Sequence, residues 1–206
     1  IENIIELANQ GIDTVYSDKT YYQLPDNTEV LIVYSTTYSW YGTHSYLGNA
    51  SDNTLDVNSA NGLVRIDGGQ GADVMIYRTN NNVTFVVDNI GDTVSLGYAL
   101  SSEVETSLSS YTLPTNIMNL NATSSTVLSL YGNNGNNVIT MNNAQSGSFV
   151  SGLSGNDTYV LGSNHANVTI IEYRNEGTDT VLFQAPGNYQ LDENIENLTL
   201  DSAAFT

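Results

Sequence analysis

The 206-residue chain contains no cysteine, only 4 lysines and arginines together, and only 3 prolines. Without cysteine, neither a disulfide framework nor a thiolate metal site can form. The longest apolar run is far shorter than the roughly 20 residues that a membrane-spanning helix needs, so we expect no membrane insertion. No basic region followed by an apolar stretch opens the chain, so no cleavable signal peptide is visible.

The charge is strongly one-sided, with 22 acidic residues and a formal net charge of -18. Nucleic acids and anionic membranes bind clustered lysine and arginine, so both are excluded as partners. An acidic chain of this kind is stabilised by a cation, and calcium is the available divalent cation outside a cell. A general acidic surface that maintains solubility is the alternative interpretation.

The residues that are present indicate strands and turns. Hydrophobic residues make up 40% of the chain, which is enough for a packed core, and 17 glycines are accompanied by many Asn, Ser and Thr residues. No segment shows the 3.6-residue period of an amphipathic helix. We therefore predict an all-β protein built from short strands separated by tight turns.

The sequence repeats internally. Shifting it by 84 residues places residues 48–92 on residues 132–176 without a gap, and glycines, acids and apolar positions all keep their register. The glycines and acids that match are Gly48 with Gly132, Gly68 with Gly152, Gly71 with Gly155, Asp73 with Asp157, Asp88 with Glu172, and Asp92 with Glu176.

A second match joins the beginning of the chain to its end, because residues 4–15 (IIELANQGIDTV) resemble residues 170–181 (IIEYRNEGTDTV). We read the chain as about two and a half copies of one module within a single domain, starting in the middle of a copy. The predicted divisions are a partial module at 1–33, an aromatic insert at 34–47, and two modules at 48–120 and 121–206.

Apolar residues within a module recur at short steps. Leu55, Ile66, Met75 and Phe85 are separated by 11, 9 and 10 residues. Two such steps make one coil of roughly 18 to 20 residues, the scale of β-helix and β-roll repeats. A single coil cannot bury its apolar face, so stacked coils must share a continuous inner ladder. The sequence therefore predicts a β-solenoid.

The sharpest motif is the glycine-rich segment 68–76 (GGQGADVMI), which fits the nonapeptide G-G-x-G-x-D-x-U-x at every defined position. Glycine permits positive φ, so the backbone can turn tightly and direct its carbonyls inward. Asp73 adds a carboxylate, and Ca²⁺ takes six to eight oxygen ligands. Degenerate copies follow at 152–160 (GLSGNDTYV) and 132–139 (GNNGNNVI), where Asn137 replaces the aspartate.

These motifs resemble the RTX, or hemolysin-type calcium-binding, repeat family in a degenerate form. The segments NDTYVLG at Asn156, GTDTVL at Gly177 and NIENLTL at Asn194 resemble the sequences that link RTX arrays, and the resemblance covers nearly all of the chain except about residues 34–47. It implies a parallel β-roll with calcium held between stacked turns. It also implies a secreted protein, located outside the cell or on its surface and of bacterial origin.

Two calcium sites are expected from this resemblance. The first combines the 68–73 turn with Asp88 or Asp92, and the second combines the 152–157 turn with Glu172 or Glu176. Asparagine at aspartate positions could instead form hydrogen-bonded ladders that need no metal. The expected metal-binding residues are Gly68, Gly69, Gly71, Asp73, Asp88, Asp92, Gly152, Gly155, Asp157, Glu172 and Glu176.

The segment 34–47 does not repeat, and its aromatic residues alternate with serine and threonine. It could form a surface for glycans or for a second copy of the protein, or it could be an inserted strand or hairpin that covers one face of the solenoid. The residues of this possible interaction surface are Tyr34, Tyr38, Trp40, Tyr41 and Tyr46.

Catalytic motifs are absent from the sequence. It contains neither an H-E-x-x-H zinc motif nor a G-x-S-x-G nucleophile elbow, and its acids recur with the modules, so we expect no enzyme. We expect first a structural module of a surface-layer, filament or adhesin protein that assembles with itself through open solenoid edges. The alternatives are an accessory secretion and folding domain of a type I secreted enzyme or toxin, and a carbohydrate-binding module.

Overall fold

The computed structural model describes residues 4–8, 10–34, 42–162, 168–185 and 188–200. These residues form 19 β-strands and no helix, so none of them forms an apolar helix that could span a membrane. The chain divides into two compact units, Ile1–Ser102 and Glu103–Thr206.

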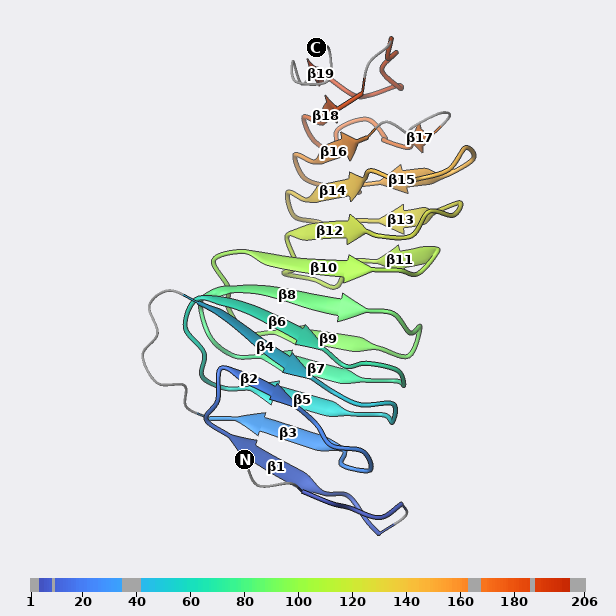
Figure 1. Cartoon of the computed structure of the whole chain (residues 1–206). Coiled ribbons are helices and arrows are strands. Elements are labelled where there is room, and N and C mark those ends of the chain that lie inside the picture. The colour runs from blue at the N-terminus through green and yellow to red at the C-terminus, as the bar shows by residue number, and fades with distance from the viewer. Residues whose placement is uncertain (1–3, 9, 35–41, 163–167, 186–187, 201–206) are drawn as a thin grey trace. The chain divides into compact units, whose positions relative to one another are not determined.

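The first unit alternates strands of two parallel series (Figure 1). Odd-numbered strands hydrogen-bond in the order β1-β3-β5-β7-β9, and even-numbered strands in the order β2-β4-β6-β8. Their bounds are β1 (Thr14–Ser17), β2 (Tyr21–Gln23), β3 (Val30–Val33), β4 (Thr43–Leu47), β5 (Thr54–Val57), β6 (Leu63–Asp67), β7 (Val74–Tyr77), β8 (Asn82–Val87) and β9 (Thr93–Leu96).

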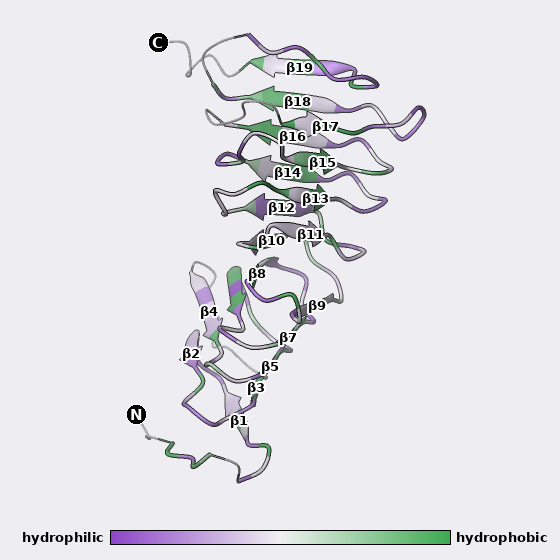
Figure 2. Cartoon of the chain, turned by 90° about the vertical axis from the view of Figure 1, so that its right-hand side faces the viewer, coloured by the Kyte–Doolittle hydropathy of each residue, from purple (hydrophilic) through white to green (hydrophobic). Residues whose placement is uncertain are grey.

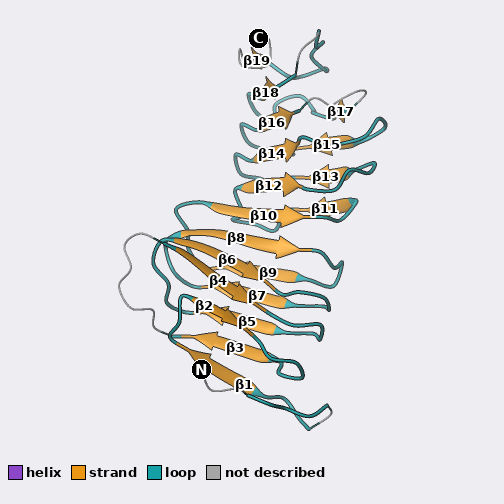
Figure 3. Ribbon diagram, viewed as in Figure 1, coloured by secondary structure: helices purple, strands orange, loops and turns teal. Residues whose placement is uncertain are grey.

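The second unit has the same construction (Figure 3). Its strands follow the orders β10-β12-β14-β16-β18-β19 and β11-β13-β15-β17, again with parallel pairing. Their bounds are β10 (Ser102–Thr106), β11 (Ser110–Thr112), β12 (Asn119–Ala122), β13 (Ser129–Tyr131), β14 (Val138–Met141), β15 (Phe149–Ser151), β16 (Thr158–Leu161), β17 (Thr169–Ile170), β18 (Thr180–Phe183) and β19 (Asn197–Leu200).

Alternation along the strands builds the core. Because successive side chains of a strand point to opposite faces, most of the strands bury every second residue, as the pattern of β8 illustrates. In-register pairing then stacks the buried residues of neighbouring coils. Leu55 pairs with Leu31 on one side and Met75 on the other, and all three are fully buried.

The same inner ladder runs through the second unit, where Ile139 pairs with Leu120 and Tyr159, again fully buried. Figure 2 shows hydrophobic residues concentrated on strands such as β16 and β18, whereas the connecting turns are largely hydrophilic. All of the apolar residues that the sequence analysis used to measure the coil, from Leu55 to Phe85, lie in the core.

Each unit is therefore a parallel β-solenoid with coils of about 19 residues, and the described residues make about nine turns in all. This confirms the predicted all-β class, the parallel pairing and the coil length of roughly 18 to 20 residues. No single coil could be stable alone, since its inner face is buried only by its neighbours.

Candidate metal centre

Within each unit, equivalent turns follow one another coil by coil and bring chemically similar residues into a stack. In the first unit these turns span 24–29, 48–53, 68–73 and 88–92, and in the second 113–118, 132–137, 152–157 and 171–179. The last residue of each turn, directly before the next strand, is an acid or an asparagine in all turns except 113–118, which ends in Met118. We call these last residues the ladder residues: Glu29, Asn53, Asp73 and Asp92 in the first unit, and Asn137, Asp157 and Asp179 in the second.

The ladder residues are joined by hydrogen bonds from one coil to the next. In the first unit the backbone N–H of Asn53 donates to Oδ1 of Asp73 at 2.7 Å. The N–H of Asp73 donates in turn to Oδ1 of Asp92 at 3.0 Å. Each carboxylate therefore satisfies the main-chain donor of the preceding coil, a donor that would otherwise be buried without a partner.

The second unit repeats this pattern. The N–H of Asn137 donates to Oδ1 of Asp157 at 2.7 Å, and the N–H of Asp157 donates to Oδ1 of Asp179 at 2.8 Å. Asp179 then donates its own N–H to Oε2 of Glu196 at 2.7 Å. The two stacks thus share one hydrogen-bond pattern, in which Asn53 and Asp73 correspond to Asn137 and Asp157 at the 84-residue offset.

Asparagine and aspartate differ in the second polar atom of the side chain, which is the nitrogen donor Nδ2 in asparagine and the oxygen Oδ2 in aspartate. The Nδ2 of Asn53 donates to the carbonyl of Thr28 at 3.1 Å, and that of Asn137 donates to the carbonyl of Ile117 at 3.2 Å. An ionised aspartate has no proton for such a bond. Oδ2 of Asp73 and Oδ2 of Asp157 are both buried without a hydrogen-bond partner from the protein.

Burial has an electrostatic consequence for these two carboxyls. It raises the pKa of Asp73 to about 7, with the nearby charges of Asp92, Asp52 and Asp88 adding to the effect. Burial likewise raises the pKa of Asp157 to about 7, and Asp179, Glu172 and Glu176 raise it further. A charged carboxylate in such a place is costly unless a positive charge accompanies it.

The glycines of these turns are required by close packing as well as by backbone conformation. A Cβ on Gly68 would collide with the side chain of Asp73, and a Cβ on Gly152 with that of Asp157. In each case the aspartate folds back over the first glycine of its own turn. This contact explains why the motif begins with glycine and carries its acid five residues later.

In the second turn, leucine replaces a glycine of the motif at a position where the backbone is left-handed. Gly69 has φ +84°, which costs little for glycine, whereas Leu153 at the equivalent position has φ +70°. A branched side chain is rarely found in this left-handed region, because its Cβ crowds the following carbonyl. The second turn therefore keeps the shape of the motif at the expense of backbone strain.

The structure distinguishes between the acids predicted for the first site. Asp92 contacts Asp73 and uses both of its oxygens, since Oδ2 accepts the backbone N–H groups of Asp88 and Asn89 at 3.1 and 3.0 Å. The side chain of Asp88 remains exposed. Asp73 therefore carries the free oxygen of this turn, next to Gly68, whereas Gly69 and Gly71 of the same turn approach the main chain of the preceding coil.

In the second site the structure brings Glu172, and not Glu176, to the turn. Glu172 is buried, and its Oε1 accepts the N–H of Gly152 at 3.0 Å and the hydroxyl of Tyr159. Glu176 is only half-buried, and its Oε2 accepts the N–H of Tyr173 at 2.8 Å. Its backbone carbonyl accepts the N–H of Gly155 at 2.7 Å, so it contributes main chain rather than a carboxylate.

Sequence reasoning missed Asp179 and the hydroxyl of Tyr159. The fixed coil length pointed to Glu176, 19 residues after Asp157, but the actual ladder residue is Asp179, 22 residues after it. The overlay of residues 4–15 on 170–181 held the necessary signal, because it aligns Asp179 with Asp13 directly before a strand. Asp13 itself donates its N–H to Oε2 of Glu29 at 2.9 Å.

A carboxylate-rich metal cage is not part of either turn. Among the described residues, no group of three or more His, Asp or Glu side chains gathers closely enough to hold a metal ion. A cation at these turns would have to combine the buried aspartate with backbone carbonyls. The residues fit such a cation in one respect, since Asp73 and Asp157 each present a buried oxygen that nothing in the protein satisfies.

Only two residues of the predicted aromatic surface, Tyr34 and Tyr46, lie in the described part of the chain. Tyr38, Trp40 and Tyr41 lie outside the described residues, and Tyr34 is exposed. For Tyr46 the expectation of a surface position is wrong: the residue points inward from β4 and is fully buried, whereas its neighbours in the strand, Ser45 and Leu47, are partly exposed. Tyr46 therefore belongs to the core.

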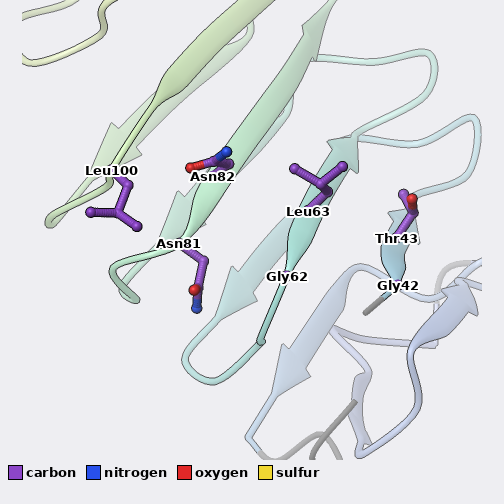
Figure 4. Close-up of a pocket in the computed structure, with 7 residues that line it drawn as sticks. All are labelled: Gly42, Thr43, Gly62, Leu63, Asn81, Asn82 and Leu100. Carbon is purple, nitrogen blue, oxygen red and sulfur yellow. The ribbon is translucent and has the colours of Figure 1, made fainter. Parts of the chain in front are cut away.

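A surface hollow of about 430 Å³ lies in the first unit, away from the acids of the ladder (Figure 4). Leu63 and Leu100 supply its apolar lining and Asn81 and Asn82 its polar lining. The Nδ2 of Asn81 is already engaged by the carbonyl of Ala60 at 2.8 Å. The hollow thus offers little convergent polar chemistry for a ligand.

None of the described turns of the two stacks contains a histidine. His44 is fully buried in β4, where burial lowers its pKa, and its Nδ1 lies 3.4 Å from the hydroxyl of Tyr46. His165 lies outside the described residues.

The chain was compared with protein-family models, curated proteins and solved structures, and none of them matches it. The class of protein that the structure defines is a parallel β-solenoid with two stacks of acid- and asparagine-bearing turns.

Proposed function

We propose that this chain is a non-catalytic, calcium-binding structural module of the RTX-like type, acting outside the cell as part of a cell-surface or self-assembling protein. One observation carries the proposal: Asp73 and Asp157, at equivalent positions of two glycine-rich turns, each hold a buried carboxyl oxygen without a partner. An orphaned buried oxygen of this kind requires a proton or a cation.

Calcium suits these turns better than other common cations. It accepts carboxylate and backbone carbonyl oxygens in irregular geometry, whereas Mg²⁺ demands a near-ideal octahedron and retains several waters. Asp73 with the backbone of 68–73, and Asp157 with the backbone of 152–157, would hold the ions. The bound ion would supply the positive charge that each buried carboxylate lacks.

Binding would be coupled to folding. A ligand that binds only the folded chain stabilises it by RT ln(1 + [L]/Kd), or about 2.7 kcal/mol per site when calcium is present at 100 times its Kd. Two sites would contribute an amount comparable with the whole stability of an ordinary domain. The protein would then be weakly folded where calcium is scarce and firmly folded outside the cell.

The test is a calcium titration of chelator-treated protein by calorimetry, with far-UV circular dichroism and sedimentation measured in parallel. We expect saturable binding and a rise in melting temperature, and growth in mass with calcium would support self-assembly. Asp73→Asn and Asp157→Asn should each remove one binding event. A wild-type protein that binds no calcium at millimolar concentration would refute the proposed function.

A further inference from the structure

The two turns with orphaned carboxyl oxygens are not chemically equal. In the described part of the first unit, Asp73 is the only acid that buries an oxygen without a partner. In the described part of the second unit there are two, Oδ2 of Asp157 and Oε2 of Glu172. Both side chains are almost completely buried, with exposed fractions of 1% and 5%.

Both acids of the second unit meet at one glycine. The side chain of Asp157 occupies the space that a Cβ on Gly152 would need. Glu172 approaches the same residue from the next coil, and its Oε1 accepts the N–H of Gly152 at 3.0 Å. The two orphaned oxygens therefore belong to carboxyls that flank a single main-chain position.

Tyr159 fixes the orientation of Glu172. Its ring is fully buried in the inner ladder, and its hydroxyl donates to Oε1 of Glu172 while accepting the N–H of Gly152 at 2.7 Å. Oε1 is thus committed to two donors, and Oε2 is left free on the other side of the carboxyl. The two hydrogen bonds to Oε1 hold the carboxyl of Glu172 in place, so that Oε2 is available to a cation.

We propose that Asp157 and Glu172 together bind one dehydrated divalent cation, that Tyr159 positions Glu172 for it, and that this turn consequently holds calcium more tightly than the 68–73 turn. The inference rests on the proposed function. Two carboxylates match the charge of Ca²⁺, whereas Asp73 leaves one positive charge to be balanced by exposed acids. Affinity at oxygen sites of this kind increases with the number of charged ligands.

The first unit lacks the corresponding arrangement. Met75, which stands at the position of Tyr159 in the repeat, carries no hydroxyl, and the exposed Asp88 stands where the repeat places Glu172. The proposed difference in affinity therefore follows from these two differences at equivalent positions of the repeat.

The experiment isolates the second turn by using the full chain with Asp73→Asn. Terbium(III), which occupies calcium sites and emits when a nearby tyrosine is excited, is titrated into this variant, and calcium affinity is measured by calorimetry. We expect emission under tyrosine excitation that calcium displaces. Adding Tyr159→Phe should remove most of the emission and weaken calcium binding about 10- to 100-fold, the usual effect of losing an outer-shell partner.

Glu172→Gln should weaken calcium binding at least about tenfold, because a charged ligand is lost. Its amide oxygen can still accept from Gly152 and Tyr159, so the fold is retained, which circular dichroism checks. Glu176→Gln is the matched control: it is the same change in the same turn, at a side chain whose Oε2 accepts the N–H of Tyr173, and it should lower the affinity far less than Glu172→Gln because it removes a nearby charge and not a proposed ligand.

If Asp157→Asn abolishes binding but Glu172→Gln and Tyr159→Phe leave the affinity intact, calcium is held without Glu172. This inference is then overturned while the proposed function stands. An equal affinity of the two turns, measured in Asp73→Asn and Asp157→Asn separately, would also overturn it. Absence of calcium binding by the wild type would refute the proposed function and this inference with it.

Discussion

Oδ1 of Asp73 accepts the backbone N–H of Asn53 from the preceding coil at 2.7 Å, and its Oδ2 meets no donor. Asn53 holds the equivalent place one coil earlier and satisfies both ends of its amide. The ladder position therefore accepts two nearly isosteric side chains, of which asparagine completes its bonds within the protein and aspartate does not.

Replacing Asp73 by Asn should raise the stability of the calcium-free protein. The new amide can donate as Asn53 does, which removes a buried unsatisfied group worth about 1–3 kcal/mol. The same change should abolish the calcium-dependent rise in melting temperature from the first turn. Differential scanning calorimetry with and without calcium measures both effects.

Asp13→Asn serves as the control for this prediction, because Asp13 also precedes a strand but is only half-buried. It should alter neither the calcium-free stability nor the response to calcium. An Asp73→Asn variant that is less stable than the wild type without calcium would contradict the proposed hydrogen-bond replacement.

The calcium-free protein should lose stability as the pH rises from about 4 to 7. Burial raises the pKa of Asp73 and Asp157 to about 7, above the unfolded value of 3.8, so the folded state binds more protons than the unfolded state in this range. Under that condition the free energy of unfolding decreases with increasing pH. Urea unfolding at pH 5, 6, 7 and 8 in chelator measures the slope.

Saturating calcium should flatten this dependence between about pH 4 and 7, because the ion replaces the protons on the same carboxyls. The double variant Asp73→Asn, Asp157→Asn should also lose most of the slope. A slope that survives in the double variant would assign the titration to other groups.

Leu153→Gly should stabilise the protein. Leucine at φ +70° bears a left-handed strain of about 1–2 kcal/mol, and glycine removes it while adding about 0.5–1 kcal/mol of unfolded-state entropy. The net gain expected in urea unfolding is about 0.5–1 kcal/mol. Leu153→Ala keeps the Cβ and should show no such gain, and equal effects of the two changes would argue against strain as the cause.

Gly68→Ala should destabilise the protein strongly and prevent calcium binding at the first turn, since the new Cβ collides with the side chain of Asp73. We expect a loss of about 1–3 kcal/mol, typical of overpacking. Gly97→Ala is the matched control, because its Cβ would meet its nearest neighbour at an ordinary 3.6 Å. Thermal unfolding of the two variants compares them directly, and similar losses would contradict the packing argument.

The fold could be read from the sequence because it depends on periodicity. Leu55 and Met75 recur in the register that parallel stacking requires, and their pairing confirms it. The tight turn at 68–73 could be predicted as well, because closely spaced glycines are typical of turns that need positive φ.

The detail of the site could not be read in this way. Coil length varies locally, so counting forward from Asp157 reached Glu176, although the longer 171–179 turn places Asp179 in the ladder and Glu172 beside Gly152. Nor could periodicity show that the hydroxyl of Tyr159 reaches Glu172. Contacts between coils depend on turn length and side-chain reach, which a one-dimensional pattern does not record.

Besides the ladder side chains, main chain meets main chain between successive turns: a Cβ on Gly71 would lie 2.7 Å from the carbonyl oxygen of Ser51 one coil earlier, and a Cβ on Gly155 2.6 Å from that of Gly135. A contact of this kind is the same for every coil that carries glycine there, whatever its other residues. Gene duplication or deletion can therefore add or remove a coil without redesigning its neighbours. The length of such a protein is a trait that evolution can adjust one coil at a time.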